Sequence, residues 1–156
     1  MRTMRIALLQ QQRGVMLIEA LVGLLIFSIG ILAMVGMQAT SIRAVAASTY
    51  RSEAAYLANQ IINTMWAEDH SNANLTTYQL NAPVAANTAC STGTNTAGNT
   101  KVDKWLTNDV SRLPRWNQFK QQIAVDSQNV VTVRLCWLSP GENGNAHQYL
   151  VTAQIR

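Results

Sequence analysis

A short stretch near the N-terminus combines residues that could carry chemistry: Arg13, Gly14 and Val15, followed four residues later by Glu19. Glu19 begins a long apolar run, where a carboxylate without a cation is costly, about 2.5–3.5 kcal/mol at the centre of a bilayer and less near its surface. Cleavage after Gly14 would create an amine on Val15, the nearest cation for this carboxylate. Glycine suits a protease that binds the backbone closely, because it has no side chain to clash. The alternative is that Glu19 merely reaches the lipid headgroups.

The apolar run after Glu19 indicates that these residues stand at the start of a membrane helix. Residues 20–42 are 23 positions without a charge. As a helix they would extend about 35 Å, more than the roughly 30 Å core of a bilayer. The run is apolar on all sides, which favours a membrane helix over one face of a soluble core. No A-x-A cleavage site of a secretory signal follows, so the ordinary interpretation is an uncleaved signal anchor.

The basic excess of the chain is concentrated before this run. The formal net charge is +4, but three of the 12 Lys/Arg residues precede Val15, whereas all 8 Asp/Glu residues follow it. The remainder therefore carries nine basic residues against eight acidic ones, which weakens a nucleic-acid-binding interpretation. The early basic residues are Arg2, Arg5 and Arg13. Arginines before a membrane helix hold that end in the cytoplasm, so we expect the rest of the chain in the periplasm.

The segment RGVMLIEALVGLLIFSIGILAMVGMQ resembles the class III signal of type IV pilins and type II secretion pseudopilins. That pattern is a short basic leader, a glycine, a hydrophobic first residue and a glutamate as fifth residue, and Gly14, Val15 and Glu19 match it. The resemblance implies that prepilin peptidase removes residues 1–14 as a leader and that the amine of Val15 is methylated. It also implies that Glu19 neutralises the N-terminal amine of a neighbouring subunit in a filament core.

The resemblance also implies partners and a location. It describes an inner-membrane protein, with a cytoplasmic N-terminus and a periplasmic head, that later enters a pilus filament with other minor and major pilins. The match covers about the first third of the chain and is strongest to minor pilins, which initiate or modify the filament. Val15 replaces the phenylalanine of many pilins, and Gly36 stands where major pilins usually carry a helix-bending proline. The leader begins at Met1 or Met4, and the sequence leaves that choice open.

Other functions share parts of this pattern. A minor pseudopilin of a type II secretion system would carry the same signal, and a signal-anchored periplasmic protein would carry the same apolar run. A DNA-receptor minor pilin of an uptake pilus would need a phosphate-binding surface. The candidate for it is a basic-aromatic cluster made of Lys101, Lys104, Trp105, Arg112, Arg115, Trp116 and Lys120. We expect this cluster to be a solvated face with core tryptophans rather than a DNA site.

The chain is not expected to be an enzyme, and no cofactor or metal is expected. His70 and His147 stand alone, without the spacing of zinc ligands. No nucleophile elbow, phosphate-binding loop or dinucleotide motif occurs in the sequence.

Hydrophobic periodicity predicts an α+β fold in which a long N-terminal helix packs on a small antiparallel sheet. Residues 15–42 are expected to be the membrane or filament-core half of the helix, and residues 43–70 its amphipathic half. The apolar stripe of that second half consists of Tyr50, Ala54, Leu57, Ala58, Ile61, Ile62 and Met65. The apolar pattern of residues 101–113 predicts a short helix that ends before Pro114.

Residues 71–156 are expected to form the head. Residues 71–100 are rich in Asn, Thr, Ala and Gly and predict an irregular loop. Alternation of apolar and polar residues predicts three strands within 118–156, starting near Phe119, Val131 and Tyr149, with Gln121 as a polar exception on the apolar side. The resemblance implies the same plan, the type IV pilin fold.

The two cysteines allow a single intrachain pairing, and we expect Cys90 and Cys136 to form a disulfide in the oxidising periplasm. The link would close a loop of about 46 residues and stabilise the head by an amount on the order of 4 kcal/mol. The alternative is two buried free thiols.

Overall fold

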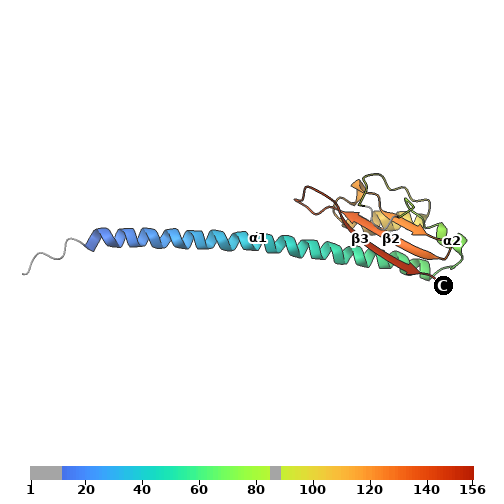
Figure 1. Ribbon diagram of the computed structural model, residues 1–156, viewed down its shortest axis with the longest axis horizontal. Helices are drawn as coiled ribbons and strands as arrows, with labels where there is room; N and C mark the ends of the chain where they lie inside the picture. Colours follow the sequence, from blue (N-terminus) through green and yellow to red (C-terminus); the bar gives the residue numbers. More distant parts are fainter. Residues whose placement is uncertain (1–11, 85–88) are drawn as a thin grey trace, which may run out of the picture. The chain divides into compact units, whose positions relative to one another are not determined.

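The computed structural model describes residues 12–84 and 89–156, with side chains from Gly14 onward (Figure 1). Most of the predicted leader, residues 1–11, lies outside the described residues. The helices are α1 (Gln12–Trp66), α2 (Asn72–Thr76) and α3 (Thr100–Lys104), and the strands are β1 (Gln122–Val125), β2 (Val130–Trp137) and β3 (His147–Gln154). The chain divides between Ala44 and Val45 into two units, and each is described by itself.

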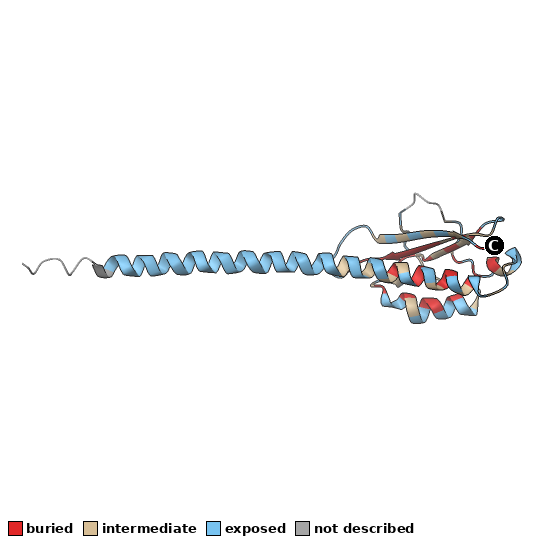
Figure 2. Ribbon diagram, turned by 90° about the horizontal axis from the view of Figure 1, so that it is seen from below, coloured by how far each residue is buried: buried red, intermediate tan, exposed pale blue. Residues whose placement is uncertain are grey.

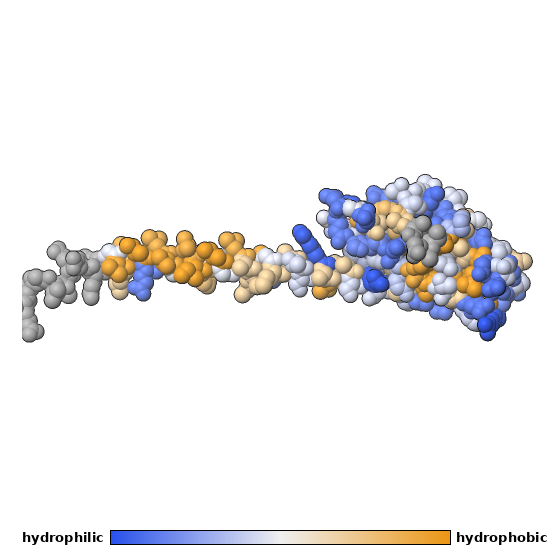
Figure 3. All heavy atoms as spheres, in the orientation of Figure 1, coloured by the Kyte–Doolittle hydropathy of each residue, from blue (hydrophilic) through white to orange (hydrophobic). Residues whose placement is uncertain are grey.

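The first unit is the N-terminal part of α1. Every side chain from Gly14 to Ala44 is exposed, and most are apolar, as the orange surface of this segment in Figure 3 shows. Among the described residues, α1 is long and apolar enough to cross a membrane. The helix runs without interruption through Gly36, whose carbonyl accepts a hydrogen bond from Thr40 Oγ1 at 3.2 Å. The helix therefore continues past this glycine without a break.

The second unit contains the C-terminal part of α1, where the predicted apolar stripe is confirmed. Six of its seven residues are buried and Tyr50 is partly buried, so that red replaces pale blue along one side of the helix in Figure 2. The helix ends at Trp66, earlier than the predicted end near residue 70. Asp69 explains the difference, because its carboxylate accepts hydrogen bonds from the hydroxyl (2.5 Å) and backbone N–H (3.0 Å) of Ser71. These two hydrogen bonds hold the pKa of Asp69 below its usual value, and the bond from the Ser71 hydroxyl has the larger effect.

The three strands form one antiparallel sheet in the order β1-β2-β3. Ile123 pairs with Val133, which in turn pairs with Val151, so that these side chains share one face of the sheet. The predicted start of the first strand, near Phe119, was wrong. β1 begins at Gln122, and Phe119 instead forms an isolated bridge with Thr92.

Apolar clusters cover both faces of the sheet. The larger cluster joins the α1 stripe to Val131, Val133 and Leu135 of β2, which confirms the predicted packing of helix on sheet. The smaller cluster, formed by Phe119, Cys136 and Leu138 with Cys90 and Ala146 against it, includes the alternate side chain Cys136 of β2. β2 is therefore the central strand of the sheet, and from Val133 to Trp137 it is buried on both sides.

Two segments differ from their predicted form. Residues 71–100 are not wholly irregular: α2 buries Leu75, and Leu80 exchanges two backbone hydrogen bonds of 2.9 Å with Ile123. Residues 100–112 are helical, but α3 passes into a π-helical turn, η1 (Trp105–Asp109), and a 3₁₀ turn, η2 (Val110–Arg112). Among these residues the predicted apolar side chains Val102, Trp105, Leu106 and Val110 are buried.

Candidate functional site

The N-terminal motif lies on the exposed first part of α1. Gly14, Val15 and Glu19 are all exposed, and a Cβ built on Gly14 would have no atom within 4 Å. The folded chain therefore has no steric need for glycine at this position.

Val15 and Glu19 are four residues apart on one helix, so they share a face one turn apart. Glu19 is the single charged residue between Gly14 and Ile42. Toward the C-terminus the next cation on the helix is Arg43, about 36 Å away at 1.5 Å per residue. No described side chain pairs with Glu19. A cation created on Val15, or one on an adjoining helix, would give this carboxylate a partner.

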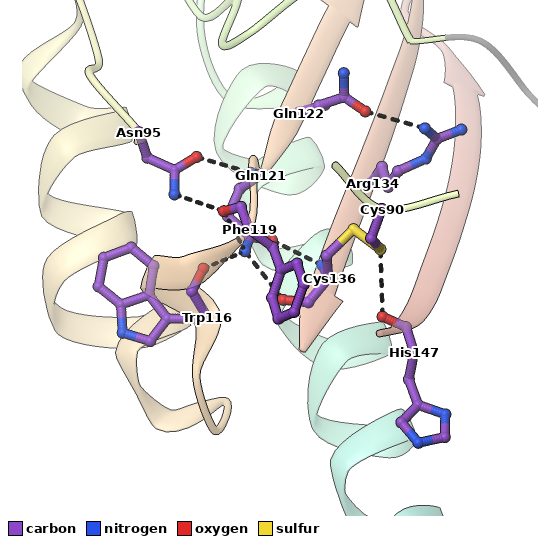
Figure 4. The surroundings of a disulfide bond; sticks show 9 residues. All are labelled: Cys90, Asn95, Trp116, Phe119, Gln121, Gln122, Arg134, Cys136 and His147. Carbon is purple, nitrogen blue, oxygen red and sulfur yellow. Dashed lines mark hydrogen bonds between the residues drawn. A yellow bond between two sulfur atoms is a disulfide. The ribbon is translucent and has the colours of Figure 1, made fainter. Parts of the chain in front are cut away.

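The predicted disulfide is present and joins Cys90 to Cys136 of β2, with the Cα atoms 6.0 Å apart (Figure 4). It fastens the segment before α3 to the face of the sheet opposite α1. On the same face, Gln122 Nε2 donates to the carbonyl oxygens of Asn81 (3.1 Å) and Pro83 (3.3 Å). The disulfide and these bonds thus hold Cys90 and the Asn81–Pro83 segment against the sheet.

Gln121 is a fully buried amide that supports the disulfide. Its Nε2 donates to the carbonyl oxygens of Trp116 (2.8 Å) and Cys136 (3.0 Å), and its Oε1 accepts from the backbone N–H of Cys136 (2.8 Å). Asn95 adds a bond of 2.7 Å from the backbone N–H of Gln121 to its Oδ1 (Figure 4). The signal in the sequence was a polar residue on the apolar side of a strand pattern, but the pattern did not reveal its partners.

Replacing Gln121 by Leu should destabilise the head by about 1–3 kcal/mol, because the buried backbone N–H of Cys136 loses its acceptor. The measurement is urea unfolding of the full chain in detergent. The control is Gln118→Leu, the same change at an exposed position. Equal stabilities of the two variants would mean that the amide network contributes nothing specific.

The basic-aromatic cluster that was the candidate DNA-binding surface does not form one exposed surface in the structure. Trp105 is buried and donates from Nε1 to the carbonyl oxygen of Leu57 at 3.1 Å. Lys101 forms an ion pair with Glu68, and Arg112 lies 3.6 Å from Glu53 and 3.5 Å from Asp109. Two of its cations are thus locally neutralised, and one of its aromatic rings is not available for stacking.

The two histidines have local partners. His70 Nε2 lies 2.8 Å from the carbonyl oxygen of Trp66, and His147 Nε2 lies 2.6 Å from Glu142 Oε2. In the described part of the chain, no cluster of three His, Cys, Asp or Glu side chains has the arrangement of a metal site.

The features that suggest a function are therefore a motif on an exposed apolar helix and a head tied by a disulfide. Comparisons of the chain with protein-family models, curated proteins and solved structures found no match.

Proposed function

We propose that the chain is a minor pilin that takes part in the assembly of a type IV pilus, by initiating or modifying the filament. Its apolar segment is most like that of the pilus-modification pilin PilV. In this proposal prepilin peptidase cuts after Gly14 and methylates Val15. The protein first resides in the inner membrane with its head in the periplasm, and then enters the filament beside other minor and major pilins.

The observation that carries the proposal is the position of the motif. Gly14, Val15 and Glu19 stand at the start of a helix whose first part exposes apolar side chains and whose last part packs on an antiparallel sheet. Such a helix can leave a bilayer only for another apolar environment, and a bundle of like helices provides one. The α+β layout agrees with the type IV pilin fold that the motif implies.

The carboxylate explains why a bundle would have a defined register. In a low dielectric a lone charge is penalised, whereas an amine and a carboxylate in contact compensate each other. A Glu19 side chain that meets the N-terminal amine of a neighbouring subunit would therefore favour one axial offset between two helices. A signal anchor in lipid has no comparable use for the carboxylate.

The proposal predicts that the chain is present in pili sheared from cells and that its presence depends on prepilin peptidase. Immunoblots of sheared pili and of membranes should detect it in both fractions of wild-type cells, and only in membranes of a peptidase-deficient strain. Detection in the pseudopilus of an overexpressed type II secretion system, and not in pili, would favour the pseudopilin alternative instead.

A further inference from the structure

A pocket of about 300 Å³ lies in the second unit. It is lined by Ala47, Ser48 and Arg51 of α1 and by Trp137, His147 and Gln148 at the end of the β2–β3 pair. Trp137 and His147 are the terminal partners of that pair, and their rings stack with centroids 5.8 Å apart and planes at 25°. The strands thus supply the two stacked rings of the lining, and the helix supplies its arginine.

The charges around the pocket are not balanced within the described chain. Arg51 is exposed and has no ion pair or side-chain hydrogen bond with any described residue. Glu142 is engaged by His147 at 2.6 Å, and Glu53, the acidic residue closest to Arg51 on the helix, lies 3.6 Å from Arg112. One guanidinium therefore remains without a counter-charge beside a pair whose charges cancel when His147 is protonated.

Trp137, one of the residues that line the pocket, has a donor without a described acceptor. Trp137 is 2% exposed, and its buried indole Nε1 has no hydrogen-bond partner among the described residues. Ser48 and Gln148 add polar side chains that make no described hydrogen bond. An acceptor with a single negative charge fits this set, because Arg51 supplies one positive charge to the lining and a dianion would keep a charge without compensation.

We propose that this pocket binds the carboxylate side chain of an Asp or Glu on a neighbouring pilin subunit, with Arg51 as its cation. The inference rests on the proposed function, since it supplies a second contact between subunits, on the head rather than on the apolar helix. A guanidinium suits this role because its planar donors can meet a carboxylate through two hydrogen bonds.

The test is a titration of the ¹⁵N-tryptophan-labelled full chain in detergent micelles, followed through the indole signal of Trp137. The probes are N-acetyl-glutamate N-methylamide, its glutamine counterpart and inorganic phosphate. The glutamate probe should shift the Trp137 signal saturably, and the other two should not.

Arg51→Gln should weaken the binding at least about tenfold, the usual effect of losing a charged hydrogen-bond partner. Arg115→Gln, the same change at another exposed arginine, should leave it unchanged. Equal shifts with the glutamine probe or with phosphate, or undiminished binding by the Arg51→Gln chain, would overturn the proposal.

A second measurement separates this inference from the proposed function. Arg51→Gln should be processed normally and be recovered in sheared pili at a lower level than Arg115→Gln. Loss of probe binding with unchanged recovery in pili would exclude a neighbouring subunit as the occupant. If the unaltered chain is absent from pili, the proposed function fails, whereas the titration still decides whether the pocket binds a carboxylate.

Discussion

Replacing Glu19 by Gln should leave leader cleavage and membrane insertion intact and strongly reduce the amount of the protein in pili. The scissile bond at Gly14 and the 23 uncharged residues that follow Glu19 are unchanged by the substitution. In a helix bundle, however, the N-terminal amine of a neighbouring subunit would lose its counter-ion. An uncompensated buried charge of this kind typically costs about 3–5 kcal/mol, which corresponds to a factor of a hundred or more in an equilibrium.

The measurement compares processing and pilus recovery in the same Glu19→Gln strain. Ser28→Ala is the matched control, since it removes a polar group from the same apolar helix without a change in charge. The hydroxyl of Ser28 bonds within its own helix, to the carbonyl oxygen of Leu24 at 2.7 Å, so its loss should not affect assembly. Recovery of the Glu19→Gln protein at the level of this control would reject the charge-pairing role.

Replacing both Cys90 and Cys136 by Ala should lower the free energy of unfolding of the head by an amount on the order of 4 kcal/mol. The bond closes a loop of 46 residues, and the chain-entropy model assigns a stabilisation of that size to such a loop. The main core on the α1 side contains neither cysteine, so the variant should still fold. The weakened part should be the small cluster around Phe119 and Leu138.

Urea unfolding of the full chain in detergent, with and without a reducing agent, provides the measurement. The reduced wild-type protein should approach the stability of the double alanine variant, and the variant itself should not respond to the reducing agent. Limited proteolysis should cut the variant faster between Asn81 and Gly98 than within α1. Unchanged stability in both measurements would show that the other contacts of this segment hold it without the covalent link.

The repeating parts of the head could be predicted from the sequence. A stripe such as Leu57, Ile61 and Met65, or the alternation along Val131, Val133 and Leu135, identifies an element because burial of one face imposes its period. The single disulfide could also be predicted, since two cysteines have one possible partner each. These features depend on spacing along the chain alone.

The other parts depend on contacts that spacing does not encode. The end of α1 is determined by hydrogen bonds from Ser71 to Asp69, and the short strand β1 begins late because Phe119 pairs with Thr92. The π-helical turn at Trp105 occurs where the indole bonds to the carbonyl of Leu57, 48 residues earlier. Such partners become visible once the chain is folded.

Of the candidate sites, too, one could be predicted from the sequence and another could not. The motif of Gly14, Val15 and Glu19 is local, so its spacing alone predicted it, whereas the cation proposed for Glu19 belongs to another molecule. The Arg51 pocket had no signal in the sequence, because its walls come from α1 and from two strands about 90 residues further along the chain. Conversely, the basic-aromatic cluster was conspicuous in the sequence, and folding paired Lys101 and Arg112 with carboxylates.

The central claim, that this chain is a processed pilin, is tested most directly by the intact mass of the protein isolated from cells. The account predicts a mature chain that begins at Val15 and carries one additional methyl group on its amine. A bulky residue in place of Gly14 should leave the precursor uncut in the membrane. A mature protein that retains Met1 or Met4 as its first residue would contradict the account.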